Sequence, residues 1–390
     1  METTSPAPFR SRQFALLAFF LLPALAVSVY DQAGRIAAGQ PPVWTELFTA
    51  VPTEKQLRRT EKRIEENSWM FRTARPWTQW GLFVTLRQAG HDIVVGKEGW
   101  LFYRPGLRYL VEPLPGKKSS VPSDPIPAIV SFRDQLAAHD IRLLVVPVPV
   151  KASLYPEKLA TRAAGHTAEI SRHAISIAER LRQSGVDVLD LRAVLADQTR
   201  PLYLKPDTHW NPEGATRAAR AVSDWLVQHR WIAPGSAGFR LQPKPIAHVG
   251  DLIAMTKSAP LASSVPTEAL TCQQVIQPDG KPYADDPSSE ILVLGDSFLR
   301  IFHRDAPGSA GFIAHLAFNL QRSLHAIVSD GGASTLVRQE LTRRPGSLAA
   351  KRVVIWEFVE RDYRSGSEGW RDLRLPENLF TTATSFAPAQ

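Results

Sequence analysis

Cysteine is nearly absent from this chain of 390 residues, in which Cys272 is the single example. One cysteine excludes a disulfide within the chain and also a cage of thiolates around a metal ion. Cys272 lies in the polar stretch LTCQQVIQPDG, which contains no histidine. We therefore interpret it as an incidental cysteine rather than a catalytic thiol.

The chain also lacks dense runs of lysine and arginine interleaved with aromatic residues, although its formal net charge is +8. Such runs are typical of nucleic-acid-binding surfaces, so we expect no nucleic-acid partner. The positive net charge is compatible with an acidic polymer or lipid headgroups as partners. It is equally compatible with arginines that are simply spread over a solvated surface. Low-complexity segments and internal repeats are absent too, and the length indicates one large domain or two smaller ones.

Long apolar runs are missing except at the N-terminus. Residues 14–30, FALLAFFLLPALAVSVY, carry no charge, and Arg10 and Arg12 precede them. This run is short for a membrane span but within range, and its basic flank places the N-terminus in the cytoplasm. A cleaved secretory signal, with the small residues ALA at 24–26, is the alternative. We expect residues 1–30 to anchor the chain in the inner membrane, with the main body in the periplasm.

Apolar strands alternate with helices through most of the remaining chain. Residues 53–90 are predicted to be helical with an interruption near Pro76, and residues 94–103 favour a β-hairpin around a Gly–Lys–Glu–Gly turn. Buried strands are then predicted at 141–150, 186–191, 290–297, 324–330 and 351–358, and helices at 128–140, 167–184, 212–229, 309–322 and 334–344.

This alternation predicts an α/β fold with a mostly parallel sheet that helices cover on both faces. We expect a helical connector at 31–92, a catalytic domain at 93–375 and a C-terminal tail at 376–390. The proline-rich residues 231–289 are predicted to form an irregular insertion or lid. In such sheets, functional sites gather beyond the carboxyl ends of the strands.

An aspartate and a histidine stand one residue apart at a predicted helix entry, in PDTHWNPEGA. Asn211 is a favourable N-cap and Pro212 suits the first helical position. In an extended chain, Asp207 and His209 point to the same side, so the carboxylate can reach the near nitrogen of the imidazole. That is how an acid–base histidine is oriented. A polar pair that only caps the helix is the alternative, and a metal site lacks a second cluster of ligands.

A serine follows another predicted buried strand, in EILVLGDSF. Gly295 permits a tight exit from the strand, and Ser297 is presented at the edge of the sheet. A serine hydroxyl needs a base, and the base needs an orienting group. Gly–Asp–Ser alone is also a common turn sequence. Together with the Asp–x–His pair, it indicates a Ser–His–Asp arrangement.

Two further stretches follow predicted strands. SDGGAS contains Gly331 and Gly332, which offer backbone N–H groups for an oxyanion, or form a plain turn. WEFVERDY contains Trp356, Arg361 and Tyr363, which are predicted either to line a sugar site or to close the fold.

At this point the sequence resembles a known family, the SGNH-hydrolase-like O-acetyltransferases of bacterial exopolysaccharide modification, of the AlgJ/AlgX alginate type. The resemblance rests on five ordered blocks: VVGKEGWLFY, VVPVPVKASLYPEKL, YLKPDTHWNPEGA, ILVLGDSF and RVVIWEFVERDY. They extend from Val94 to Tyr363 and so cover most of the chain. The chain departs from the family pattern at Ser329 and Asp330, where the family has an arginine before the glycines.

The resemblance implies an SGNH-like fold and a catalytic triad in which Asp207 orients, His209 is the base and Ser297 is the nucleophile. It also implies transfer of an acetyl group through an acetyl-serine to a polysaccharide hydroxyl, with a donor relayed by a membrane-bound O-acyltransferase. The acceptor would be an exopolysaccharide, acidic if alginate-like. The residues suggest neither a metal nor another cofactor.

Two alternative functions stay open on the sequence. A carbohydrate acetylesterase would use the same triad with water as the acceptor. A non-catalytic scaffold of a polysaccharide export complex would use the fold without the chemistry.

Overall fold

The computed structural model describes residues 11–48, 51, 53–111, 124–197, 199–330, 332–365 and 369–381. It divides into two compact units. One unit comprises Met1–Arg87 together with Thr256–Ser264, and the other comprises Gln88–Met255 and Val265–Gln390. The second unit contains the sheet and the candidate site.

The first unit is helical. Its elements are α1 (Ser11–Ala37), the 3-10 helix η1 (Val43–Phe48), α2 (Glu54–Asn67), α3 (Trp69–Leu86) and α13 (Ala259–Ser264). The interruption predicted near Pro76 lies instead at Ser68, whose extended backbone (φ −64°, ψ 127°) separates α2 from α3. Pro76 is accommodated inside α3, where its carbonyl accepts a hydrogen bond from the Ser258 hydroxyl at 2.5 Å.

The predicted membrane anchor at residues 1–30 is not supported by the structure. Residues 1–10 and the side chains of residues 11–18 lie outside the described part of the chain. Helix α1 extends over 27 residues and contains Pro23. Among the described residues, no helix is both long enough and apolar enough to cross a membrane.

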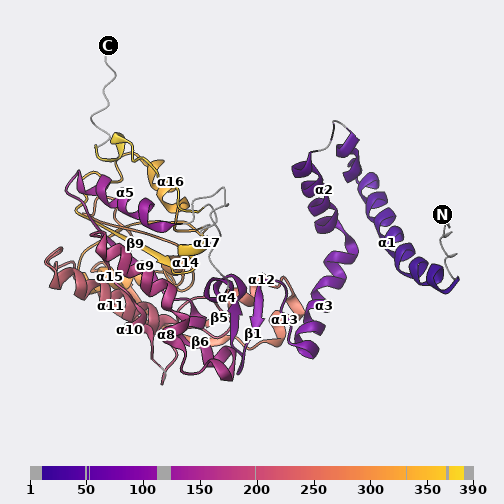
Figure 1. Ribbon diagram of the computed structural model, residues 1–390, viewed down its shortest axis with the longest axis horizontal. Helices are drawn as coiled ribbons and strands as arrows, with labels where there is room; N and C mark the ends of the chain where they lie inside the picture. Colours follow the sequence, from indigo (N-terminus) through magenta and orange to yellow (C-terminus); the bar gives the residue numbers. More distant parts are fainter. Residues whose placement is uncertain are drawn as a thin grey trace, which may run out of the picture. The chain divides into compact units, whose positions relative to one another are not determined.

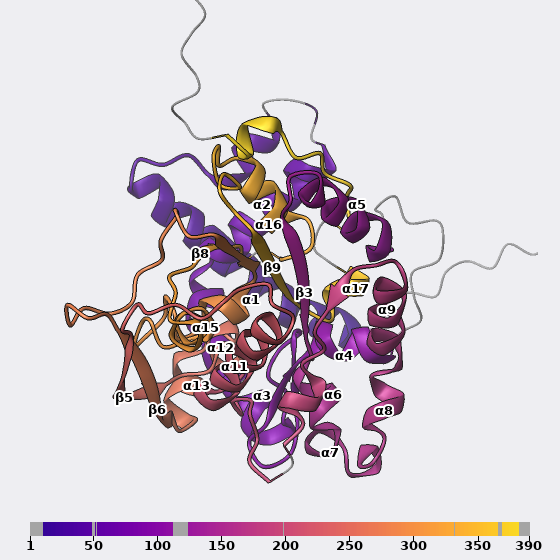
Figure 2. The ribbon, with the colours of Figure 1, turned by 90° about the vertical axis from the view of Figure 1, so that its left-hand side faces the viewer.

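The second unit is built on five parallel strands in the order β4–β3–β9–β7–β8, which confirms the predicted parallel sheet. Figure 1 labels the central strand β9, and Figure 2 labels β3, β9 and β8. Every residue of β7 and β9 is buried, as is typical of strands with helices on both faces. The strands are β3 (Arg142–Val148), β4 (Asp187–Val188), β7 (Ile291–Gly295), β8 (His325–Val328) and β9 (Val353–Val359).

Helices flank this sheet in the positions that the alternation predicts. Helix α5 packs on β3, and α16 packs on β7 and β8, while α11 and α15 lie against each other (Figure 2). The helices of this unit are α4 (Arg104–Val111), α5 (Pro125–Ala137), α6 (Lys151–Leu154), α7 (Pro156–Leu159), η2 (Thr161–Ala163), α8 (Thr167–Ile170), α9 (Arg172–Gln183), α10 (Arg192–Leu195), α11 (Pro212–Gln228), α12 (Asp251–Met255), α14 (Ser297–Arg300), α15 (Phe312–Leu320), α16 (Leu336–Thr342), α17 (Asp362–Ser365) and η3 (Glu377–Leu379).

Two antiparallel ribbons stand outside the main sheet. The predicted hairpin is confirmed as β1 (Ile93–Val95) paired with β2 (Leu101–Tyr103). The prediction that residues 231–289 are irregular is wrong, because β5 (Arg240–His248) pairs along its full length with β6 (Glu268–Ile276). Most of β5 is exposed, so its sequence lacks the apolar alternation that would have revealed a strand.

The carboxyl ends of the parallel strands lie along one edge of the sheet. Lys151 follows β3, Arg361 follows β9, Ser297 follows β7 and Gly332 follows β8. Residues far apart in the sequence therefore meet at this edge, which is where α/β sheets carry their sites.

Candidate active site

Ser297 begins α14 directly after β7, in a turn that the core holds on two sides. The Asp296 carboxylate accepts hydrogen bonds from the N–H groups of Phe298 (2.9 Å) and Val359 (3.1 Å). The Asp296 N–H donates to the Glu357 carboxyl at 3.1 Å. A Cβ at Gly295 would lie 2.3 Å from that carboxyl oxygen, so glycine is required for the approach.

Asp207 and His209 lie in the loop before α11. The predicted helix entry is confirmed, since the Asn211 side chain accepts from the Gly214 N–H at 2.9 Å and Pro212 takes the first helical position. The loop is closed by a bridge between Tyr203 and Trp210. Both side chains of the Asp–x–His pair are buried: Asp207 is 1% exposed and His209 is 4% exposed.

The imidazole of His209 connects the aspartate to the serine. Its Nδ1 lies 2.6 Å from Asp207 Oδ1, and its Nε2 lies 2.8 Å from Ser297 Oγ. The backbone N–H of His209 also donates to Asp207 Oδ1 at 2.9 Å. The structure thus brings together the three residues that the sequence analysis selected, in the relative geometry of a nucleophile, a base and an orienting carboxylate.

Opposed effects set the charges of this pair. Burial by itself would raise the pKa of Asp207, but the charge and hydrogen bonds of His209, with donors from His248 and the Asp251 N–H, hold that pKa well below its usual range. Burial likewise works to lower the pKa of His209, yet the Asp207 carboxylate, followed by Asp251 and Asp296, raises it. The site therefore favours an imidazolium at His209, the species that forms when the histidine takes the serine proton.

Three residues that sequence reasoning missed hold the histidine side of the site. His248 Nε2 donates to Asp207 Oδ2 at 2.8 Å, and the Asp251 N–H donates to the same oxygen at 2.9 Å. Lys151 Nζ donates to the carbonyls of Leu204 (3.0 Å), Lys205 (3.0 Å) and Asp207 (2.5 Å). His248 and Asp251 belong to the segment that lacked a predicted structure, and nothing local in the sequence connects them with Asp207.

Lys151 is an unusual buried cation, only 5% exposed. Its ammonium lies 5.3 Å from the ring centroid of Trp100 and 5.2 Å from that of Phe102. Burial lowers the pKa of Lys151 to about 7, despite the opposing charge of Asp207. Its contacts with three carbonyls between Leu204 and Asp207 indicate that it fixes the segment leading into the Asp–x–His pair.

The residues predicted after the last two strands separate into core and pocket. Trp356 is fully buried in β9, packs edge-on against Phe132 and donates its indole N–H to the Ala333 carbonyl at 2.8 Å. Tyr363 is also buried, against Phe358. Of the two predicted alternatives, Trp356 and Tyr363 therefore close the fold, and their burial rules out that they line a sugar site.

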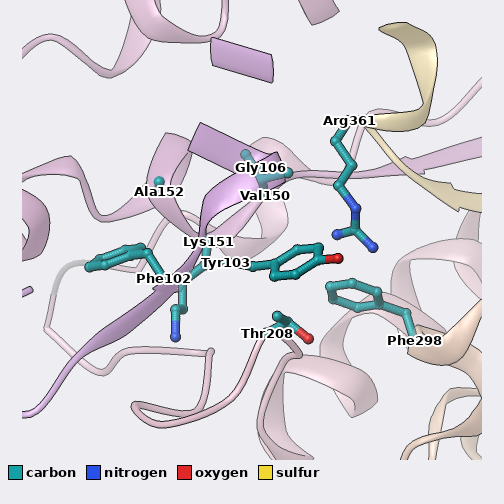
Figure 3. Close-up of a pocket in the computed structure, with 9 residues that line it drawn as sticks. All are labelled: Phe102, Tyr103, Gly106, Val150, Lys151, Ala152, Thr208, Phe298 and Arg361. Carbon is teal, nitrogen blue, oxygen red and sulfur yellow. The ribbon is translucent and has the colours of Figure 1, made fainter. Parts of the chain in front are cut away.

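Arg361 does line a pocket beside the triad. Its guanidinium lies 5.3 Å from the ring centroid of Tyr103, and Figure 3 shows both side chains turned toward Phe298. Thr208 and Phe298, the chain neighbours of His209 and Ser297, line the same pocket. The pocket consequently lies next to His209 and Ser297.

The glycines after β8 are only partly described. Gly331 lies outside the described residues. Gly332 has a φ of 139°, which favours glycine, and its N–H donates to the Ser329 carbonyl at 3.3 Å. The Ser329 N–H in turn donates to the Gly295 carbonyl at 3.0 Å, so this turn is tied to the end of the strand that precedes Ser297.

One group in the described part of the chain has the spacing of metal ligands. Donor atoms of Asp207, His209 and Asp251 lie within 4.8 Å of one another. These atoms already serve hydrogen bonds, since Asp251 accepts from the N–H (2.8 Å) and the hydroxyl of Thr208. The arrangement fits a hydrogen-bonded relay around a carboxylate better than an open ligand set.

Fold and site together define an SGNH-hydrolase-like α/β domain, and comparison with known proteins agrees. The family model of the SGNH hydrolase-like domain of acetyltransferase AlgX matches residues 93–360. The chain belongs to this family.

The chain is similar to curated proteins of two kinds. It is 27% identical over 376 residues to the probable alginate O-acetylase AlgJ of Pseudomonas aeruginosa, covering 90% of each chain. It is 25% identical over 241 residues to the alginate biosynthesis protein AlgX of the same organism, covering 59% of this chain and 49% of that protein. The first likeness extends over nearly the whole length of both chains.

A solved structure supports the fold. The O-acetyltransferase domain of Pseudomonas putida AlgJ superposes with a TM-score of 0.54 at 21% identity, covering 76% of this chain and 96% of that domain.

Proposed function

We propose that the protein is an O-acetyltransferase that moves an acetyl group, through an acetyl-serine at Ser297, to a hydroxyl of an alginate-like exopolysaccharide. The observation that carries the proposal is the position of His209 between Asp207 (2.6 Å) and Ser297 (2.8 Å). The family membership and the names of the relatives supply the transferred group and the acceptor.

In the first half-reaction, His209 Nε2 takes the hydroxyl proton of Ser297 while Oγ attacks the carbonyl carbon of the acetyl donor. The tetrahedral intermediate collapses, the bond to the leaving group breaks, and the imidazolium returns its proton to that group. The second half-reaction repeats these steps with a sugar hydroxyl as the nucleophile and Ser297 as the leaving group. Asp207 stays ionised throughout and stabilises the imidazolium.

We propose that the acceptor reaches the triad at the mouth of the pocket beside it. Tyr103 presents an aromatic ring and Arg361 a cation there, which suits a sugar ring that carries a carboxylate. We further propose that the reaction takes place in the periplasm, where a membrane-bound O-acyltransferase partner supplies the acetyl group.

Replacement of the nucleophile tests the assignment. Ser297→Ala should lower turnover of a chromogenic acetyl ester by roughly 10⁴-fold or more, because removal of a triad nucleophile abolishes the covalent route. The control is Ser184→Ala, at an exposed serine, which should keep full activity. Mass spectrometry of the intact protein after incubation with the ester should show one added acetyl group on the parent chain and none on Ser297→Ala.

The acceptor separates this proposal from its two alternatives. Alginate oligosaccharides should gain acetyl groups when they are added with the ester. Release of free acetate alone, with every acceptor tested, would favour an acetylesterase. Acetylated oligosaccharide produced equally well by Ser297→Ala would disprove the triad assignment. Neither ester turnover nor acetylated oligosaccharide with the parent chain would favour a scaffold role.

A further inference from the structure

We propose that His248, at the end of β5, is a positioning residue of the active site that holds the carboxylate of Asp207 in place against His209. The inference rests on the proposed function, since it gives a role in that chemistry to a residue outside the triad. It also gives the β5–β6 ribbon a part in catalysis.

The contacts of the Asp207 carboxylate carry the argument. Oδ1 faces His209, through Nδ1 at 2.6 Å and the backbone N–H at 2.9 Å. Oδ2 faces the ribbon instead, where it accepts from His248 Nε2 at 2.8 Å and from the Asp251 N–H at 2.9 Å. Because the carboxylate is ionised, His248 Nε2 must be the donor in this contact. Two imidazoles thus hold the two oxygens of one buried carboxylate.

The chain is shaped to bring His248 to this position. A Cβ at Gly250 would lie 1.9 Å from the Pro206 carbonyl oxygen, so only glycine allows the end of the ribbon to pass so close to the Asp–x–His loop. The His248 ring also packs against Phe302, with 5.8 Å between ring centroids. A histidine that served only to fill the ribbon surface would not require this approach.

Loss of the His248 N–H should have a defined electrostatic consequence. Oδ2 would keep only the Asp251 N–H, so the carboxylate would attract the His209 proton more strongly and the pKa of His209 would rise. The other charges that face this network are Asp251 and Asp296 near His209, Lys151 behind Asp207, and Glu268 opposite His248 in the ribbon. None of these changes in a His248 variant. A higher pKa leaves less neutral base at a given pH, which moves the acidic limb of the kcat/KM profile upward.

The test compares two substitutions in the full chain, with 4-nitrophenyl acetate as the probe. His248→Ala removes the donor and should lower kcat by about tenfold, as expected for loss of a hydrogen bond to a charged group. It should leave KM nearly unchanged and shift the acidic limb of the pH profile to higher pH. His248→Gln keeps an N–H at a similar reach and should retain kcat within about twofold of the parent, with the limb in place.

His303→Ala is the matched control for general destabilisation. His303 is also buried and also pairs with a carboxylate, at 3.2 Å from Asp285, but its substitution should lower the melting temperature without moving the pH limb. The proposal is overturned if the limb stays in place in His248→Ala, or if His248→Gln loses as much kcat as His248→Ala. Failure of the proposed function is recognised separately, by ester turnover that persists in Ser297→Ala.

Discussion

The two halves of the site are held in different ways. On the serine side, the turn after β7 is fixed by Asp296 and by contacts with β9, all within the buried sheet. On the histidine side, Asp207 depends on a lysine after β3 and on a ribbon that lies outside the sheet. Ser297, the proposed nucleophile, therefore belongs to the core, whereas His209, the proposed base, is oriented by peripheral elements.

This difference separates stability from catalysis. A disturbance at the serine side cannot be relieved without moving buried strands, so it should lower both the stability and the activity. A substitution at the histidine side can be accommodated by a shift of the exposed ribbon. Such a shift should misorient the Asp207 carboxylate more than it lowers the free energy of unfolding. Variants in the two halves can check this distinction.

The largest effects are expected at Asp207 and Asp296, because one aspartate orients the histidine and the other fixes the serine turn. Asp207→Asn should lower kcat/KM by roughly 10³–10⁴-fold, because an amide fits the space but cannot stabilise the imidazolium. Asp296→Ala removes the cap and the tie to β9 and should cost about 1–2 kcal/mol of unfolding free energy. Ester kinetics and thermal denaturation check both. If kcat/KM of Asp207→Asn stays within tenfold of the parent value, Asp207 does not orient His209 in a catalytic triad.

The sequence indicated the serine side more completely than the histidine side, for a local reason. Gly295 and Ser297 follow an apolar β-branched strand, and both the strand and its tight exit can be recognised within eight residues. The Asp–x–His pair was equally visible, and the helix entry at Asn211 located it. The parallel order of the strands followed from their alternation with helices.

The partners of Asp207 could not be predicted because they come from distant segments. His248 lies 41 positions from Asp207 on a strand without apolar periodicity, and Lys151 lies 56 positions away. At Trp356 the sequence left two alternatives open, because an aromatic residue near the end of an apolar strand can stack on a sugar or fill the core. In the structure Trp356 is fully buried between Arg338 and Phe132 and belongs to the core. Only tertiary packing distinguishes these cases.

A smaller effect is expected from Gly295 and Gly250, the two glycines at which an added Cβ would meet another part of the site. Gly295→Ala places a Cβ 2.3 Å from the Glu357 carboxyl inside the sheet and should cost about 1–3 kcal/mol of unfolding free energy. Gly250→Ala meets the Pro206 carbonyl, a backbone group, at 1.9 Å, so the clash is relieved only if the chain next to His248 shifts away from the Asp–x–His loop. Gly250→Ala should therefore lose about tenfold in kcat, as His248→Ala does. Full kcat in Gly250→Ala would contradict the link between the end of the ribbon and the orientation of Asp207.

The smallest effect concerns a carboxyl that supports the serine side without taking part in the reaction. Burial and then the charge of Asp296 raise the pKa of Glu357 well above its ordinary value, so the folded protein keeps a proton there that the unfolded chain releases. The unfolded state then binds fewer protons, and stability must fall as the pH rises above about 4.5. Asp362, whose pKa burial raises to about 6, adds to the same slope at lower pH. Glu357→Gln should flatten this slope, as measured by urea denaturation across pH, and should leave kcat/KM within about threefold. If Glu357→Gln shows the same dependence of stability on pH as the parent, Glu357 is ionised in the folded protein. The Asp296 N–H would then donate to a buried carboxylate.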